Sequence, residues 1–216
     1  MVADFDHQAA RLFSGRRHDC GAGALHGDFG TLLGIVVALL RMSRVKLLKV
    51  LAGAYIEFLR GTPLLVQVLI VFYGLPQMGV KLPRMTAGTV ALVINSAAYM
   101  AEIVRSGIQA IDGGQTEASR SLGMNGAQTM IYIILPQAIK NILPAIGNEF
   151  ISIIKESSIL YTIGIYELTY QANKLASTNF RYLETLTISA LIYFVLTFTA
   201  SRLLGMLERR MRRGDR

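Results

Sequence analysis

The sequence predicts an all-α membrane protein with about five transmembrane helices, the first of them short or disrupted. Of its 216 residues 52% are hydrophobic and only 17% are charged, whereas soluble proteins carry about 25% charged residues. The charged residues are missing from whole segments, which is typical of a chain that crosses a bilayer several times. Because each span takes about 20 apolar residues, little of the chain is left for a separate soluble domain.

The spans follow from the stretches without Asp, Glu, Lys or Arg, because a charge at the centre of a span costs about 2.5 to 3.5 kcal/mol. Four such stretches are 12, 20, 17 and 17 residues long: Phe29–Leu40, Gly61–Val80, Met85–Ala101 and Thr185–Ser201. A fifth span is predicted between Gln137 and Tyr166, although that stretch contains three charged residues.

The first 28 residues differ from the rest of the chain. They contain all three histidines, the only cysteine and seven charged residues. We therefore expect two parts: an atypical polar segment over residues 1–28, disordered or altered by a reading-frame error, and one membrane domain over residues 29–216. The apolar stretch that follows residue 28 predicts a helix of about 18 Å, too short for a hydrocarbon core of about 30 Å. The alternative is a genuine short or re-entrant first segment.

The basic residues predict the orientation of the chain. Four Lys or Arg residues lie between Arg41 and Lys49 and six lie from Arg202 onward, but the two opposite loops hold only two each. By the positive-inside rule both clusters are cytoplasmic, so five spans place the N-terminus outside and the C-terminus in the cytoplasm. Topology and lipid headgroups account for the net charge of +8. We expect no nucleic-acid partner, because no aromatic residues alternate with the basic ones.

The stretch from Ser121 to Ile139 is also free of charge, but we do not predict a span there. It is rich in glycine and amides, and Pro136 interrupts its apolar run. Two short cytoplasmic helices fit better. The first is expected to start near Thr116, with Glu117 close to the positive end of the helix dipole, and to stop at Gly123.

This loop, residues 112–136, resembles the coupling-loop signature EAA-x3-G-x9-I-x-L-P of importer-type ABC transporter permeases. The matching positions are Glu117, Ala118, Ser119, Gly123, Ile133, Leu135 and Pro136. Only Ser119 departs from the signature, as one small residue in place of another. The run YIEFLRGTPLLVQ from Tyr55 resembles the polar amino acid subfamily of these permeases, and so do NSAAYMAEIVRSGI from Asn95 and GNEFISIIKESSI from Gly147. The resemblance covers about residues 29–216.

The resemblance implies the permease subunit of an ATP-driven importer of polar amino acids, of the glutamine, histidine or arginine type, in a bacterial cytoplasmic membrane. It implies two permease subunits around the pathway, identical or homologous, two ATPase subunits on the 112–136 loops, an extracytoplasmic amino acid-binding protein and surrounding lipid. ATP would be bound by the ATPase, since this chain has no G-x-x-x-x-G-K-[ST] motif. No cofactor, metal site or enzymatic activity is expected, because residues 27–216 contain neither His nor Cys. The alternative is a stand-alone secondary transporter or channel for a small polar solute.

Polar residues recur at helical spacing inside two of the predicted spans. The candidates for the substrate pathway are Asn95, Tyr99 and Glu102 in the third span, and Asn148, Glu149, Ser152, Lys155 and Glu156 in the fourth. Charged side chains do not face lipid, so they either line the pathway or pack against other helices. Glu57 and Arg60, three residues apart, are expected to pair with each other at the membrane surface.

Overall fold

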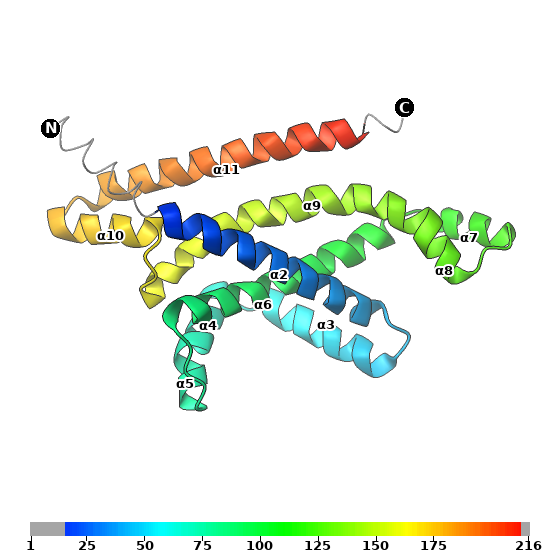
Figure 1. The fold of residues 1–216 in the computed structure, drawn as a ribbon, viewed down its shortest axis with the longest axis horizontal. Coiled ribbons are helices and arrows are strands. Elements are labelled where there is room, and N and C mark those ends of the chain that lie inside the picture. Colours follow the sequence, from blue (N-terminus) through cyan, green and yellow to red (C-terminus); the bar gives the residue numbers. More distant parts are fainter. Residues whose placement is uncertain (1–15, 213–216) are drawn as a thin grey trace.

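Four long helices run through the length of the computed structural model of the chain, and the first two of them cross in the view of Figure 1. The structure describes residues 16–212 and, for side chains, residues 29–210. The four helices are α2 (Arg16–Met42), α6 (Arg84–Gln109), α9 (Leu135–Glu156) and α11 (Tyr182–Arg212). Helix α6 contacts both α2 and α9, and α9 contacts α11. Within the described residues the structure contains only helices and turns, which confirms the predicted all-α class.

Helices α2 and α6 approach closely because small residues line their contact. A Cβ atom at Gly34 would collide with Met100, and one at Gly30 would lie 2.8 Å from Ser96 Oγ. Ala38, four residues further along α2, is fully buried. Small residues four apart form a groove that lets two helices meet at backbone distance, so the helix of the first predicted span is anchored from Gly30 onward.

The apolar part of α2 within the residues whose side chains are described is Phe29–Met42, shorter than a span. The helix itself begins at Arg16. The polar residues 16–28 therefore belong to the same helix, which does not begin at residue 29. The prediction for residues 1–15 lies outside the described part of the chain, and the suggested reading-frame error stays a prediction.

The second predicted span, Gly61–Val80, proves to be half of a broken helix pair. Helix α3 (Lys46–Gly61) is followed by α4 (Leu64–Leu69), the π-helical turn η1 (Ile70–Gly74) and α5 (Leu75–Gln77). The two halves are bent by 106° at Thr62 and Pro63, whose extended backbone interrupts the helix. Figure 1 shows α5 leaving the bundle.

Helix α3 is absent from the prediction because its first turn carries Lys46 and Lys49, and charge alone assigns that stretch to a loop. Both lysines are exposed, while Ala52, Gly53, Ile56 and Leu59 are buried at helical spacing. From the middle of α3, Tyr55 donates a hydrogen bond of 2.6 Å to the carbonyl of Ile94 in α6. A search for stretches without charged residues therefore misses a half-buried helix whose first turn is basic.

The fourth predicted span starts earlier than expected. Helix α7 (Gly113–Ser121) is followed by a turn and then by α8 (Gly126–Gln128), the π-helical segment η2 (Thr129–Ile134), α9 and the 3-10 helix η3 (Ser157–Ile163). From Gly126 to Ile163 the chain is one helix. Contrary to the prediction, Pro136 does not end a helix; it lies in the first turn of α9. A π-helical turn directly before it leaves a carbonyl without an α-helical partner, so a residue without an N–H fits there.

One further helix completes the fold. Helix α10 (Leu168–Asn179) occupies a segment predicted as a loop, and it packs against α11. Among the described residues, three helices are long and apolar enough to cross a membrane, Arg84–Gln109, Gly126–Ile163 and Tyr182–Arg210, and the bent pair adds a fourth. Together with the apolar part of α2, they correspond to the five predicted segments.

Candidate functional site

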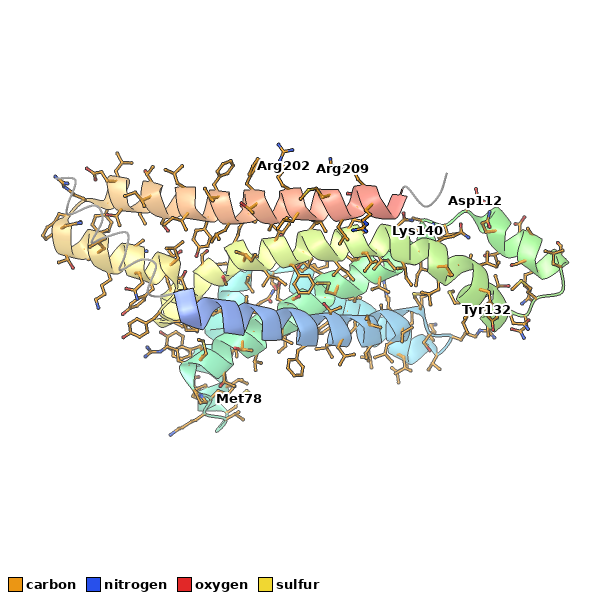
Figure 2. All side chains as sticks on the ribbon, turned by 45° about the horizontal axis from the view of Figure 1, so that its top comes forward. Met78, Asp112, Tyr132, Lys140, Arg202 and Arg209 are labelled. Carbon is orange, nitrogen blue, oxygen red and sulfur yellow. The ribbon has the colours of Figure 1, made fainter. Side chains whose placement is uncertain are left out.

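The first candidate site is the segment from Asp112 to Pro136, which we call the coupling protrusion. Figures 1 and 2 show α7 and α8 projecting from one end of the helix bundle, with Asp112 and Tyr132 at that end. Helix α7 begins at Gly113, three residues before the predicted start, because the Asp112 carboxylate accepts a 2.6 Å hydrogen bond from the Gly114 N–H. Glu117 therefore lies beyond the first turn of α7, and the predicted interaction with the helix dipole is wrong.

The turn between α7 and α8 is held by its own polar groups. Gly123 has a φ of 83°, a left-handed conformation that favours glycine, and α7 ends there as predicted. Asn125 and Gln128 form a reciprocal capping box at the start of α8. Ser119 Oγ lies 3.1 Å from Thr129 Oγ1 and ties the two helices together. The protrusion is thus a small preformed unit.

The signature residues divide into an exposed and a buried group. Glu117, Ala118, Gly123, Leu135 and Pro136 are exposed, Ile133 is half-buried, and Ser119 is buried. Sequence reasoning missed the apolar residues beside them: Leu122 is 84% exposed and Tyr132 is 69% exposed. Both residues could have been found in the sequence as apolar side chains in a segment that was not predicted to span the membrane. Exposed apolar groups on a rigid unit favour contact with a partner.

The second candidate site is a group of charged side chains on α2, α3 and α6, which we call the charge cluster: Arg41, Glu57, Arg60, Glu102 and Arg105. Arg105 binds both carboxylate oxygens of Glu102, with Nε 2.8 Å from Oε2. Arg60 Nη1 lies 3.8 Å from Glu102 Oε1. Arg41 Nη2 lies 3.5 Å from Glu57 Oε1. The predicted pairing of Glu57 with Arg60 is therefore wrong, because each has a partner on another helix.

Asn95 does not line a pathway within this chain; it is 3% exposed. Its Nδ2 donates a 3.0 Å hydrogen bond to Gln67 Oε1. Gln67 Nε2 in turn donates to the carbonyls of Leu59 and Thr62, at 2.8 and 3.1 Å, and to Thr62 Oγ1 at 2.9 Å. These bonds satisfy the backbone groups freed by the bend between α3 and α4. The sequence analysis missed Gln67 because its hydrogen-bond partners lie at a bend, and no periodic pattern in the sequence indicates that bend.

The other candidates fall into two places. Tyr99 and Glu102 are half-buried on α6, and the Arg60 guanidinium lies 5.4 Å from the centre of the Tyr99 ring. Glu149 on α9 lies within electrostatic range of Glu156 and of Arg60, which places it between the two groups of candidates. On the rest of α9, Asn148 and Lys155 are exposed and Ser152 and Glu156 are half-buried. Lys155 and Glu156 lie about 10 Å further along the helix from Glu149.

Glu167 is a buried polar group that the sequence reasoning did not single out. It caps α10, accepting hydrogen bonds from the N–H groups of Thr169 (2.7 Å) and Tyr170 (2.6 Å) and from the Tyr193 hydroxyl (2.9 Å). Burial raises the pKa of its carboxyl group above the ordinary value, although these hydrogen bonds oppose the shift. The carboxyl joins α10 to α11, which is a structural role.

The membrane helices, the broken pair and the protruding helical loop together define a multi-pass membrane subunit of the permease class. The chain belongs to the family described as "binding-protein-dependent transport system inner membrane component", whose model matches residues 30–213. It is therefore a subunit of an inner-membrane transport system, and the alternative of a stand-alone carrier is not supported.

Relatives and solved structures agree with this assignment. The chain is 42% identical to the probable amino-acid permease protein YxeN of Bacillus subtilis (strain 168) over 85% of this chain and 83% of that protein. It is 43% identical to the probable glutamine ABC transporter permease protein GlnM of the same organism, over 87% and 86%.

Among solved structures, a chain of an amino acid ABC transporter crystallised with histidines is 50% identical, with a TM-score of 0.92 over 97% of this chain and 98% of that one. A chain of the MetNI methionine ABC transporter, at 18% identity, 90% and 95% coverage and a TM-score of 0.67, shares the fold.

Proposed function

We propose that the chain is the permease subunit of an ATP-driven importer of polar amino acids. Its curated relatives carry names that refer to amino acids in general, to glutamine and to arginine, and the chain covers most of their length. The polar and charged side chains of α6 and α9 support a polar substrate, because a purely apolar lining would leave its charged groups without partners.

The observation that carries the mechanism is the coupling protrusion. A rigid pair of short helices beyond the end of the bundle is suited to insertion into a groove on a partner protein. We assign Glu117, Ala118, Ser119, Gly123, Ile133, Leu135 and Pro136 to the coupling with an ATPase subunit, directly or, for buried Ser119, by holding the unit together. Because α8, η2, α9 and η3 form one helix from Gly126 to Ile163, a displacement of the protrusion is transmitted directly to the membrane.

The remaining parts of the system are proposals of the same kind. Two copies of the chain, or this chain and a homologue, enclose the pathway. Two ATPase subunits bind the protrusions and ATP, and an extracytoplasmic binding protein delivers the amino acid. The protrusion and the basic end of α11 then lie on the cytoplasmic side, with the N-terminus outside. We assign Tyr99, Glu102, Asn148, Glu149, Ser152, Lys155 and Glu156 to the pathway and its surroundings, and Asn95 to the support of the bend. The chain itself needs no cofactor.

The test is reconstitution of the chain with its cognate ATPase, any second permease and the binding protein in proteoliposomes. We expect ATP-dependent uptake of at least one of L-glutamine, L-arginine, L-histidine and L-glutamate when the binding protein is present, and none when it is omitted. A matched preparation with a catalytically inactive ATPase controls for leakage. Uptake that persists without the ATPase would contradict the proposal and point to a stand-alone carrier.

A further inference from the structure

Arg60 stands out among the arginines of the charge cluster because, within the described residues, it has a long ion pair with Glu102 but no hydrogen bond. It lies in the last turn of α3 with its side chain 40% exposed. Its nearest carboxylate oxygen, Glu102 Oε1, is 3.8 Å away, beyond hydrogen-bonding distance. Within the described part of the chain, its remaining contacts are the face of Tyr99 and the field of Glu149. A guanidinium carries five N–H donors, so this side chain is ready to bind an acceptor.

Glu102 is shared between Arg60 and Arg105, and Arg105 is the closer of the two. Both oxygens of Glu102 are bound by Arg105 in a forked arrangement, the strongest geometry for an arginine and a carboxylate. Arg41 is likewise engaged, since it donates a 3.1 Å hydrogen bond to the carbonyl of Lys49 and contacts Glu57. The positive charge of Arg60 therefore has only a long ion pair, shared with Arg105, among the described residues of this cluster.

The position of Arg60 is fixed by the bend that follows it. The carbonyl of Leu59, one residue before Arg60, accepts the hydrogen bond from Gln67, and Gln67 is bound to Asn95 on α6. The Tyr99 ring, 5.4 Å from the guanidinium, adds a cation–π contact that limits its motion. An arginine inside a membrane domain is costly, and those that occur mark functional sites. A side chain that is already fixed also loses little entropy on binding.

We infer that the Arg60 guanidinium binds the carboxylate group of the transported amino acid. This inference rests on the proposed function and adds a residue outside the eight pathway candidates of the sequence. An α-amino acid carries a carboxylate and an ammonium group on the same carbon atom. In this inference the ammonium group is assigned to Glu149, a carboxylate of α9 within electrostatic range of Arg60. The planar fork of arginine suits a carboxylate, whereas lysine offers only a point charge.

Uptake by variants of the complete complex tests the inference. Arg60→Gln is expected to lower ATP-dependent uptake per assembled complex at least tenfold, and Arg60→Lys to restore it only in part. Arg84→Gln is the control, because Arg84 lies outside the charge cluster and its Nη1 donates a 3.0 Å hydrogen bond to the carbonyl of Gly164; its uptake is expected to equal that of the wild type. Uptake by assembled Arg60→Gln complexes equal to that of wild type would overturn the inference while leaving the proposed function intact. If the wild-type complex transports none of the four amino acids, the proposed function itself fails.

A second measurement needs no variant. The wild-type complex without binding protein, in nanodiscs, is titrated with the transported amino acid and with its α-carboxamide, which keeps the ammonium group but lacks the carboxylate. We expect the amide to bind at least tenfold more weakly; equal binding would overturn the inference even if Arg60→Gln fails to assemble. Nanodiscs of phosphatidylcholine alone are compared with nanodiscs containing phosphatidylglycerol. If Arg60→Gln changes only the response to the anionic lipid, Arg60 binds a lipid phosphate and the inference is wrong.

Discussion

Gly123 is the residue on which the turn of the coupling protrusion depends. Its φ of 83° is left-handed, and no atom lies within 4 Å of the position that a Cβ would take. We expect Gly123→Asp to reduce co-purification of the ATPase at least fivefold, because bulk and charge enter the proposed interface. Affinity purification of the chain from detergent, with quantification of the bound ATPase, measures the effect.

The chain offers a matched control for that variant. Gly79 has a φ of 87° and equally open surroundings, but it lies in the turn that follows α5, away from the protrusion (Figure 1). Gly79→Asp introduces the same backbone cost and the same charge, so it is expected to leave the ATPase bound. Equal loss of ATPase in both variants would show that Gly123→Asp acts through folding, and unchanged binding in Gly123→Asp would contradict the assignment of the protrusion.

Glu167 gives the described domain a pH dependence. Since burial raises its pKa in the folded state, the folded chain binds a proton more readily than the unfolded one. The contribution of this group to stability is complete below the unfolded value of about 4.5 and is lost as the pH rises through the folded value. We expect the thermal midpoint of the wild type, measured in detergent, to fall over that window relative to Glu167→Gln. Parallel pH profiles of the two proteins would exclude this role.

At the scale of elements, the bend between α3 and α4 depends on Gln67. Replacing it with leucine leaves the carbonyls of Leu59 and Thr62 and the amide of Asn95 without their partner. Each buried polar group left unsatisfied costs about 1 to 3 kcal/mol. We expect Gln67→Leu to lower the thermal midpoint of the assembled complex by several degrees and Gln77→Leu, an exposed glutamine of α5, to have no effect. Equal midpoints for the two variants would show that the bend is held by other contacts.

The contact between α2 and α6 tolerates no added side chain. Gly34→Ala places a methyl group against Met100 and the backbone of Ala97, so we expect a lower yield of folded protein and a lower thermal midpoint. Gly205→Ala in α11 is the control, because no atom lies within 4 Å of its Cβ position. That substitution is expected to be neutral or stabilising, since alanine favours the helix over glycine by about 1 kcal/mol. A stabilising effect of Gly34→Ala would contradict the close approach of the two helices.

At the scale of the whole molecule, the first helix determines how well the domain fits a bilayer. The apolar part of α2, Phe29–Met42, covers about 21 Å at 1.5 Å per residue, less than a hydrocarbon core of about 30 Å. Replacing residues 19–28 with an apolar run is expected to raise the amount of chain inserted in the membrane, measured by carbonate extraction. The ATPase is expected to co-purify with both forms, because the protrusion is unchanged. No gain in insertion would show that the native segment already suffices.

The all-α membrane class, the coupling loop and the stop at Gly123 could be predicted from the sequence because they depend on local properties. Each of them can be recognised from residues that are neighbours in the sequence: a stretch without charge, a glycine at a helix end, and a motif with fixed spacing. The predicted start of α7 is wrong by three residues, since Asp112, and not a residue near Thr116, provides its cap. The continuity across Pro136 depends on a π-helical turn, which has no reliable signature in one sequence.

The partners of polar side chains were decided by the tertiary structure alone. Glu57 and Arg60 have the spacing of a helical pair, but Arg41 and Glu102 from other helices contact them instead. Asn95 has the spacing of a pathway residue, yet it is buried against Gln67. Periodicity specifies which face of a helix a residue occupies, and only packing specifies what lies opposite that face. For this reason the sequence by itself determined the class and the family resemblance of this protein, while the long, shared ion pair of Arg60 emerged only when the helices were brought together.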